Sequence, residues 1–492
     1  MDYGDKNLKC FLPMRKIIKL FVISIVLSAA ITGCNKYLNE PLPAGVISEE
    51  NAYISDNSVS AVVTGNFLNL SGGGLFGGSS SANLAYVTGL YMDELKNLGS
   101  SSNTTNIAFY TDAIQFSNTL HWTDLYTKVF KVNSTLEGIN STGAALYYKN
   151  QWLGESYFIR AFLYFYLTNL YGDVPLALTS DYATNNTLSR APQSQVYQQI
   201  IADLRQAQGL LNSGYTDGYG ASTSHRVRPN RYAASALLAK TYLYTQKWDS
   251  AEVQADSVIG NSTYLLTAIN QVFGAGSSET IWSLALPSSS SQGYQYGFYN
   301  NGMPSPIQSP NSPTTYNVLV CMDTALINAF EPGDNRRTTW VRTVPVFGAN
   351  PAITYYFPNK YTASAASSEN EIILRLAEIY LIRAEARAHL NNISGAQADL
   401  NTVRTRAGLP NTTATDAAGL LNAISRERRV ELFTENANRF FDLKRTGTID
   451  SVMTAFAPQK GGSWSHYMQL FPIPTNDLIQ DPSLTANPEY QQ

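Results

Sequence analysis

The sequence predicts a mostly α-helical protein with repeated helix pairs and long irregular insertions. Helical stretches are expected at 46–70, 121–140, 150–171, 193–213, 228–259, 371–407 and 417–446. The segments between them, at 71–110, 214–227, 262–365 and 446–492, are rich in Gly, Ser, Asn, Pro and Tyr. We therefore expect a helical scaffold formed mainly by 46–70, 121–259 and 371–446, with two long insertions at 71–110 and 262–365.

An internal repeat indicates how the helices pair. A Leu-Ala-x-x-Tyr motif occurs at 238–242 and again at 376–380, and each copy is followed by a helix with an alanine at its fourth position, at 248–251 and 393–396. Small residues that let two antiparallel helices approach are typical of tetratricopeptide-like pairs. The spacing predicts that the first helix of the second copy is longer by about two turns. Such pairs form a curved scaffold, and the repeat itself predicts no ligand.

The first element along the chain is an N-terminal leader. A basic stretch at 15–19 precedes an apolar run at 20–31 and small Gly33, directly before Cys34, which is the order of a bacterial lipoprotein signal. The apolar run is shorter than the ~20 residues of a membrane-spanning helix. We expect residues 1–33 to be removed and Cys34 to begin the mature protein, with palmitate-type acyl chains as a stable membrane anchor.

Two points about this leader stay open. Met14 begins a better signal than Met1, so residues 1–13 could precede the true start. The leader could also be an ordinary N-terminal helix that ends in a core cysteine, although the complete three-part pattern favours a signal.

Composition excludes several function classes. Charged residues make up 14% of the chain and the net charge is −3, so no basic field for nucleic acid is present and uncharged partners are favoured. Of the three cysteines, two belong to the leader and anchor, which leaves Cys321 as a buried small hydrophobe without a disulfide partner. The four histidines are too scattered for metal spacings, so we expect neither a metal site nor a cofactor.

Three segments that resemble ligand-binding motifs have structural interpretations. Between 426 and 445, arginines alternate with acids, and the spacings Arg428–Glu431 and Glu435–Arg439 allow ion pairs along one helix. Mixed signs favour a structural network over an anion site. The glycine-rich run at 72–78 lacks the Lys-Ser/Thr of a phosphate loop and is expected to be a flexible loop, whereas 172–175, Gly-Asp-Val-Pro, is a helix stop.

Four blocks in order carry a family resemblance. Glu155-x-x-Phe-x-Arg-Ala-Phe leads to Leu-Tyr-Gly-Asp-Val-Pro-Leu at 170–176; Arg-Leu-Ala-Glu-x-Tyr-Leu-x-Arg-Ala-Glu-Ala lies at 375–386; Arg-Glu-Arg-Arg-Val-Glu-Leu lies at 426–432; and Arg-Phe-x-Asp-Leu-x-Arg lies at 439–445. Together with Cys34-Asn-Lys-Tyr-Leu and the ending Ala-Asn-Pro-Glu-Tyr at 486–490, they closely resemble the SusD/RagB lipoproteins of Bacteroidota. The family usually has glycine where Glu489 stands. The resemblance covers residues 34–492, expected as one SusD-like domain.

The resemblance implies a non-catalytic protein on the outer membrane, facing the cell exterior. Such a protein captures oligosaccharide nutrients and delivers them to a SusC-like TonB-dependent transporter. Which glycan is bound does not follow from the resemblance, because glycan contacts vary between members of the family.

Aromatic residues of the insertions are the candidate glycan contacts, because sugar rings stack on aromatic faces while their hydroxyls bind amides and carboxylates. The segment 292–301 has no helical period and holds Tyr294, Tyr296, Tyr299 and Asn300. The first insertion and the region after 334 add four further candidates, Tyr86, Tyr91, Asp93 and Trp340. The insertions 71–110 and 262–365 are thus expected to form the ligand face. The alternative is that these aromatic residues only pack the insertions onto the scaffold.

Other functions remain open at this point. Capture of peptides or another nutrient by a protein of the same family is the first alternative. A repeat-protein adaptor would bind a peptide in its concave groove, but it would not need the tyrosine-rich insertions. A glycoside hydrolase would need two carboxylates across a cleft, and nothing in the sequence identifies such a pair.

Overall fold

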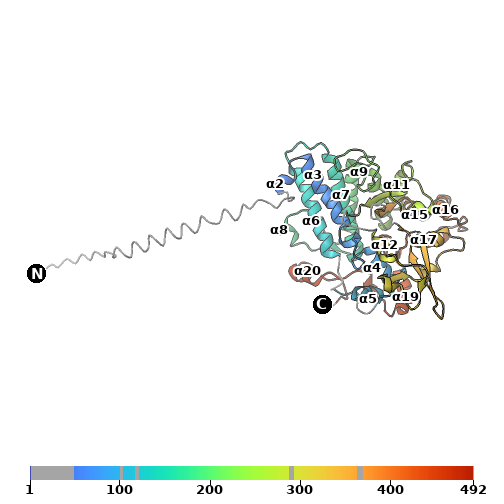
Figure 1. Cartoon of the computed structure of the whole chain (residues 1–492). Helices are drawn as coiled ribbons and strands as arrows, with labels where there is room; N and C mark the ends of the chain where they lie inside the picture. Colours follow the sequence, from blue (N-terminus) through green and yellow to red (C-terminus); the bar gives the residue numbers. More distant parts are fainter. Residues whose placement is uncertain (2–48, 100–102, 117–120, 288–292, 363–368, 491–492) are drawn as a thin grey trace. The chain divides into compact units, whose positions relative to one another are not determined.

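The computed structural model of the chain describes residues 1, 49–99, 103–116, 121–287, 293–362 and 369–490. The chain divides into two units, residues 1–52 and 53–492. In the first unit the described part contains helix α2 (Glu49–Ala52). The predicted leader, apart from Met1, and Cys34 lie outside the described residues. The second unit is mainly helical (Figure 1), which confirms the predicted fold class. Among the described residues, no helix has the length and apolar character needed to cross a membrane.

Helix α7 (Lys149–Tyr171) is the central helix of the first half. It is buried almost along its whole length because apolar and aromatic residues surround it on all sides. Helices α6 (Trp122–Ser141) and α9 (Gln193–Leu210) both pack against it. As predicted, Gly172 ends the helix, with a positive φ of 76°. The other helices of this half are α3 (Asp56–Ser71), α4 (Leu84–Tyr91), α5 (Thr104–Tyr110) and α8 (Tyr182–Asn185).

Two antiparallel helix pairs follow, as the repeat predicts: α10 (Arg231–Tyr244) with α11 (Trp248–Ile259), and α15 (Leu376–His389) with α16 (Ile393–Arg406). The pairs stack, with α11 against α15 and α10 against α9. The predicted difference in length is wrong, because α10 and α15 both contain 14 residues. Leu238 lies in the middle of α10 whereas Leu376 begins α15, so the two Leu-Ala-x-x-Tyr motifs do not occupy equivalent positions.

The second insertion leaves and rejoins the scaffold through one pair of strands. Antiparallel β4 (Thr280–Leu284) and β9 (Glu371–Arg375) are fully buried, so the prediction of helix over 371–375 is wrong. Between them lie short helices and a three-stranded sheet in the order β5 (Ile307–Gln308), β7 (Val341–Phe347), β8 (Ile353–Pro358). The remaining elements here are β6 (Val320–Met322), α12 (Tyr294–Tyr299), α13 (Thr324–Ile327) and α14 (Asn335–Thr339).

Two short strand pairs involve the first half of the chain. β1 (Leu95–Asn97) pairs with β6 of the second insertion, so the two insertions are joined by backbone hydrogen bonds. β2 (Val174–Pro175) pairs with β3 (Arg190–Ala191) directly after α7.

The predicted helix over 417–446 is two helices, α17 (Ala417–Glu431) and α18 (Asn438–Arg445). Thr434, Asn436 and Ala437 adopt positive φ angles between them, which breaks the helix and redirects the chain. The final segment is not wholly irregular, since it contains α19 (Ile449–Phe456) and α20 (Thr475–Gln480). Short 3₁₀ helices lie at Gly74–Phe76, Ile269–Gln271, Pro313–Tyr316, Ala457–Lys460 and His466–Gln469.

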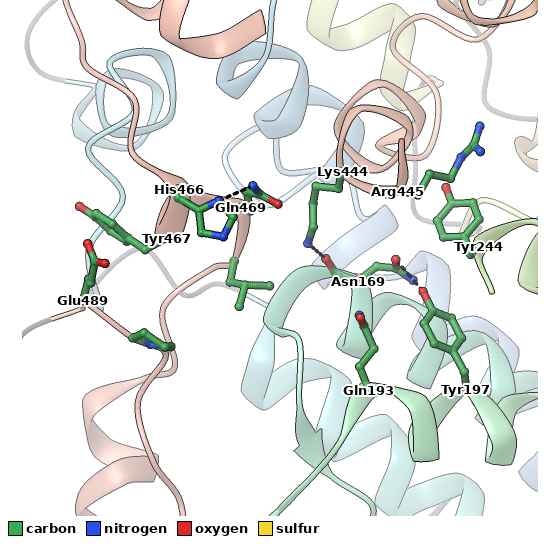
Figure 2. A pocket seen from close by; sticks show the side chains of 12 residues that line it. Asn169, Gln193, Tyr197, Tyr244, Lys444, Arg445, His466, Tyr467, Gln469 and Glu489 are labelled. Carbon is green, nitrogen blue, oxygen red and sulfur yellow. Dashed lines mark hydrogen bonds between the residues drawn. The ribbon is translucent and has the colours of Figure 1, made fainter. Parts of the chain in front are cut away.

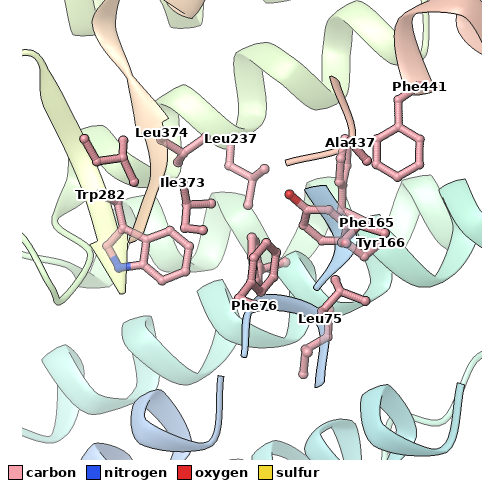
Figure 3. Packing of buried hydrophobic residues seen from close by; sticks show 14 of the residues in the cluster. Leu75, Phe76, Phe165, Tyr166, Leu237, Trp282, Ile373, Leu374, Ala437 and Phe441 are labelled. Carbon is pink, nitrogen blue, oxygen red and sulfur yellow. The ribbon is translucent and has the colours of Figure 1, made fainter. Parts of the chain in front are cut away.

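A core of aromatic rings joins the two halves of the second unit (Figure 3). The ring of Phe162 on α7 lies 5.4 Å from that of Phe76 and 5.0 Å from that of Trp282 on β4. Phe165 and Tyr166 continue the cluster to Phe441 on α18. Phe76 belongs to the run at 72–78, so part of the expected flexible loop is a 3₁₀ turn anchored in the core.

Candidate functional site

Five of the eight predicted glycan contacts lie where the two insertions join, on or beside α12 and on α4. Tyr86 on α4 lies 6.2 Å from Tyr299 and 5.5 Å from Phe298 of α12, ring centre to ring centre. Both tyrosines are at most 1% exposed. The hydroxyl of Tyr86 accepts a hydrogen bond from Asn106, and burial raises the pKa of Tyr86 to about 12. These two rings therefore pack one insertion on the other.

The partly exposed side of α12 is formed by Tyr294 and Tyr296. The segment 294–299 forms a short helix although its sequence has no helical period. The Tyr294 hydroxyl donates to the carbonyl of Ser71 at 3.0 Å, and its ring lies on Gly78, where a Cβ would be only 2.6 Å from the ring. Asn300 is buried and accepts a hydrogen bond from Arg342 at 3.0 Å. Partly accessible rings thus lie beside an arginine and an amide.

The other three predicted contacts, Tyr91, Asp93 and Trp340, are also buried. Tyr91 packs among Phe109, Phe440, Trp464 and Phe471. Asp93 binds Arg429 and Arg439, each at 2.7 Å; burial opposes its charge, but the two arginines keep the pKa of Asp93 below its ordinary value. Trp340 donates through Nε1 to the carbonyl of Ile269 at 2.8 Å.

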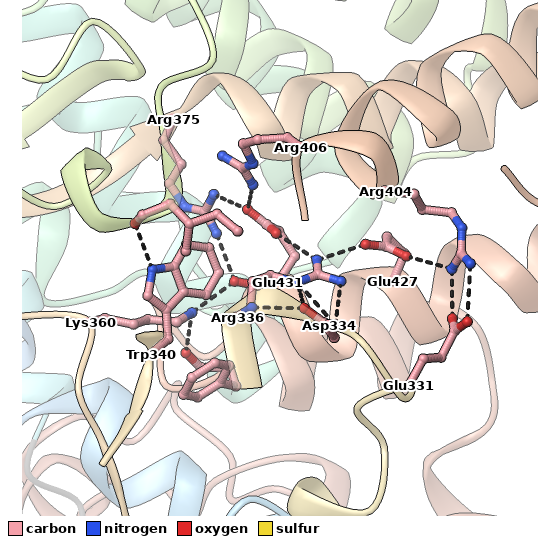
Figure 4. A network of polar contacts seen from close by, with 12 residues as sticks. Glu331, Asp334, Arg336, Trp340, Lys360, Arg375, Arg404, Arg406, Glu427 and Glu431 are labelled. Carbon is pink, nitrogen blue, oxygen red and sulfur yellow. Dashed lines mark hydrogen bonds and ion pairs between the residues drawn. The ribbon is translucent and has the colours of Figure 1, made fainter. Parts of the chain in front are cut away.

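A buried network of ion pairs occupies the interface of α17, β9 and α14 (Figure 4). Glu431 accepts from Arg336 at 2.7 Å and from Arg375 at 2.6 Å, and it also binds Arg406. Burial would raise the pKa of Glu431, but the three arginines outweigh it and hold the pKa well below its ordinary value. This carboxylate is therefore charged and fully neutralised by its neighbours.

The predicted structural network is confirmed, but its predicted partners are wrong. Arg428 binds Asp442 at 2.7 Å and lies 3.5 Å from Glu378, rather than binding Glu431. Glu435 binds Arg375 and Lys360 rather than Arg439. Glu435 lies in the turn after α17 and Arg439 lies on α18, so these two are not on one helix. Arg428 and Glu431 are both on α17, but each binds charged residues of other elements.

Of three hollows of about 300 Å³ or more in the described part of the second unit, two have aromatic side chains in their lining. A cavity of about 380 Å³ lies among α7, α9, α18 and the C-terminal segment (Figure 2). A groove of about 320 Å³ lies among α6, α8 and α20, with the rings of Trp122, Tyr126 and Phe130 along it and Tyr182, 76% exposed, at its rim. The volumes suit one or two sugar units.

The sequence interpretation missed the residues of the cavity in Figure 2, which include Lys444, Tyr197, Tyr244, His466, Tyr467 and Glu489. Lys444 stands in the segment interpreted as an ion-pair network, and the others are far apart in the chain. The one signal was Glu489 in place of the family's usual glycine. Among the described residues, no three His, Cys, Asp or Glu side chains are grouped as ligands for a metal ion.

Two family models match the chain. The model described as "SusD family" matches residues 177–490, and the one described as "Starch-binding associating with outer membrane" matches residues 75–243. Among curated proteins, SusD-like protein P25 of Formosa agariphila is 25% identical over 95% of this chain and 98% of its own length. SusD-like protein P2 of the same organism is also 25% identical, over 95% and 99% of the two chains.

Solved structures show the same fold. A laminarin-binding SusD-like protein has a TM-score of 0.69 and 25% identity, with 88% of this chain and 99% of the other covered. A SusD superfamily protein of Bacteroides vulgatus has a TM-score of 0.72 and 20% identity, over 88% and 98% of the two chains. NanU of B. fragilis has a TM-score of 0.71 and 22% identity, over 92% and 100%.

Proposed function

Because this chain belongs to the SusD family, we propose that it is a non-catalytic lipoprotein of the outer membrane that binds oligosaccharides outside the cell. The observation that carries glycan binding is the similarity, at 25% identity over 88% of this chain, to a protein described as laminarin-binding. The family-model description that names starch and the outer membrane supports the same class of ligand and the same location. Neither description identifies the glycan that this chain binds.

The part of the predicted face that suits a sugar is the accessible side of α12. Tyr294 and Tyr296 keep part of their surface exposed, as a stacking platform requires. Arg342, which donates a hydrogen bond to Asn300, lies beside them and can bind hydroxyl groups. The six other predicted residues have less than 5% of their surface exposed, and we do not propose them as direct contacts.

The test compares two tyrosines of the same short helix. Binding of laminarin-derived and starch-derived oligosaccharides is measured by calorimetry for Tyr296→Ala and for Tyr299→Phe, with melting curves for both. We expect Tyr296→Ala to weaken binding about tenfold or more, because stacking of one ring on an aromatic side chain is worth about 1–3 kcal/mol. The melting temperature should change little. Tyr299→Phe keeps the buried ring and should bind as the wild type does.

Unchanged affinity in Tyr296→Ala would exclude α12 and move the site to the groove of Tyr126, Phe130 and Tyr182. If the protein bound no glycan but bound members of a peptide library, its ligands would be peptides rather than glycans.

We also propose the anchor and the partner that the family implies. Cys34→Ser should release the protein from membranes or leave its leader uncleaved, whereas unchanged membrane fractionation with normal lipid labelling would contradict a lipid anchor. A SusC-like TonB-dependent transporter should co-purify in mild detergent through an interface of about 1,200–2,000 Å² or more. Isolation of the chain alone under these conditions would contradict delivery to such a transporter.

A further inference from the structure

The cavity of Figure 2 contains a lysine without a counter-charge. Lys444, at the end of α18, donates to the carbonyl oxygen of Asn169, and its ammonium lies 5.0 Å from the ring centre of Phe440. Across the described residues, no carboxylate oxygen lies within 4 Å of the ammonium of this partly exposed lysine, whereas the more deeply buried Lys128, Lys240, Lys360 and Lys460 each pair with an acid. Burial lowers the pKa of Lys444 to about 7. A partly buried ammonium without a counter-charge is stabilised by an anion that enters the cavity.

A second polar group of the same cavity also lacks a partner. The hydroxyl oxygen of Tyr244, at the end of α10, is buried and has no hydrogen-bond partner among the described residues. The neighbouring guanidinium of Arg445 is already occupied, because it binds Glu385 and Asp442. Lys444 and Tyr244 therefore keep hydrogen-bonding capacity that the protein itself does not use.

Opposite Lys444, the C-terminal segment brings an acid to the cavity at the cost of backbone strain. Glu489 has a φ of 65°, a conformation that glycine adopts without strain. Its neighbours fix it there: Asn487 donates to the carbonyls of Tyr171 and Phe471, and the hydroxyl of Tyr490 donates to the carbonyl of Leu470. A strained residue that persists in this way points to a role for its side chain.

Figure 2 shows how the groups are distributed. Lys444 and Asn169 lie on one side, Tyr467 and Glu489 on the other, and His466 and Gln469 between them. The cavity thus offers a cation at one end, and at the other an aromatic ring with an acceptor for hydroxyl groups. A ligand with one negative charge and several hydroxyls matches this arrangement, whereas a polyanion would be repelled by Glu489.

We propose that this cavity is a second binding site, distinct from α12, for a sugar unit that carries a single carboxylate or sulfate group. Lys444 binds the anionic group, Tyr244 donates to it or to a neighbouring oxygen, and Glu489 accepts from ring hydroxyls. The saccharide part of this assignment rests on the proposed function, and the anionic part rests on the cavity alone.

The test measures calorimetric binding of glucuronic acid, glucose 6-sulfate, glucose, acetate and the dipeptide Ala-Ala to the purified full chain. At least one of the two acidic sugars should bind about tenfold or more tightly than glucose, since a charge-assisted hydrogen bond contributes at least this factor. It should also bind more tightly than acetate, because the ring hydroxyls contribute. Which of the two binds identifies the anionic group.

Variants assign the binding to the cavity. Lys444→Met should remove the preference for the acidic sugar over glucose. Lys131 is an exposed lysine on α6, and Lys131→Met should leave this preference unchanged. Glu489→Gly should weaken binding of the acidic sugar several-fold without weakening binding of acetate. It should also raise the melting temperature, because it relieves the backbone strain. The Glu489 variant serves as the test if Lys444→Met does not fold.

Equal affinity for glucuronic acid, glucose 6-sulfate and glucose would overturn the proposal, and so would an undiminished preference in Lys444→Met. Binding of acetate as tight as that of the sugars, or Lys444-dependent binding of Ala-Ala alone, would overturn the saccharide assignment. Loss of oligosaccharide binding in Tyr296→Ala with no effect of Lys444→Met would leave the proposed function intact and remove only this second site.

Discussion

The ion-pair network around Glu431 and the aromatic core around Phe162 are both inaccessible to water, yet different forces stabilise them. Glu431 is surrounded by three arginines that must each keep a defined distance and direction. Phe162 contacts Phe76, Tyr166 and Trp282 at ring distances of 5.0–5.4 Å, and its contacts are mainly non-directional.

The difference teaches how each region should respond to small changes. Removal of one charge from a buried network leaves the opposite charge unpaired in a medium where that is costly. Replacement of a buried aromatic side chain by an aliphatic one lowers stability only a little if the volume and the apolar surface are kept. Chemically conservative substitutions should therefore be severe in the first region and mild in the second.

The largest effect is expected for Glu431→Gln. The substitution keeps the shape of the side chain but leaves Arg336, Arg375 and Arg406 with one acid fewer, so the free energy of unfolding should fall by about 3–5 kcal/mol. Denaturant unfolding at pH 7 measures this. The matched control is Glu331→Gln at the edge of the network, where the side chain is 51% exposed and pairs with Arg404, and a loss below about 1 kcal/mol is expected. Similar losses for the two variants would contradict the distinction.

A smaller effect is expected from acid. The pKa of Asp442 is held at about 2 because Arg428 and Arg445 outweigh the effect of burial. The unfolded chain takes up this proton near pH 4 and the folded chain only near pH 2, so stability is lost as the pH falls between these values, by about 2 kcal/mol in total. Unfolding curves at pH 5, 3 and 2 measure the loss, and Asp442→Asn should remove this part of the pH dependence. An unchanged pH profile in the variant would assign the acid sensitivity to other groups.

In the aromatic core, Phe162→Met should cost less than about 1.5 kcal/mol, because methionine is apolar, flexible and close in volume. The same denaturant curves measure it. A loss as large as that of Glu431→Gln would mean that ring geometry, rather than apolar volume, stabilises this core.

The smallest effect is expected for Tyr299→Phe. The hydroxyl of Tyr299 is buried and finds no hydrogen-bond partner among the described residues, so its removal should leave stability unchanged or raise it by up to about 1 kcal/mol. A clear loss of stability, read from the melting temperature, would reveal a polar contact of this ring and weaken the contrast between the two regions.

Local patterns predicted the helices well and the long-range contacts poorly. Helical periodicity found α7, α10 and the two stacked pairs, because amphipathic spacing is a property of the local sequence. It could not separate β9 from α15, since residues 371–375 are as apolar as the helix that follows and only pairing with β4 makes them a strand.

The same limit explains the candidate site. Tyr86 and Tyr299 lie in different insertions, and their burial follows from contact with each other, which no local window contains. The spacing of charges within 426–445 predicted that these charges would form ion pairs. It did not predict which elements carry their partners. For Lys444 the decisive property is the lack of an acid nearby, and a neighbouring Asp442 in the sequence conceals it.

The pairing of Leu284 with Glu371 brings the two ends of the second insertion side by side on the scaffold. A segment whose ends meet in this way can be lengthened, shortened or exchanged during evolution without moving the helices that carry it, since the entropy of closing a longer loop rises only slowly. Arg336 and Lys360 set the boundary of that freedom, because their buried pairs with Glu431 and Glu435 tie the insertion back to α17 and the turn after it. The rest of the insertion can therefore change in length and sequence without moving the scaffold, provided that these two basic residues are kept.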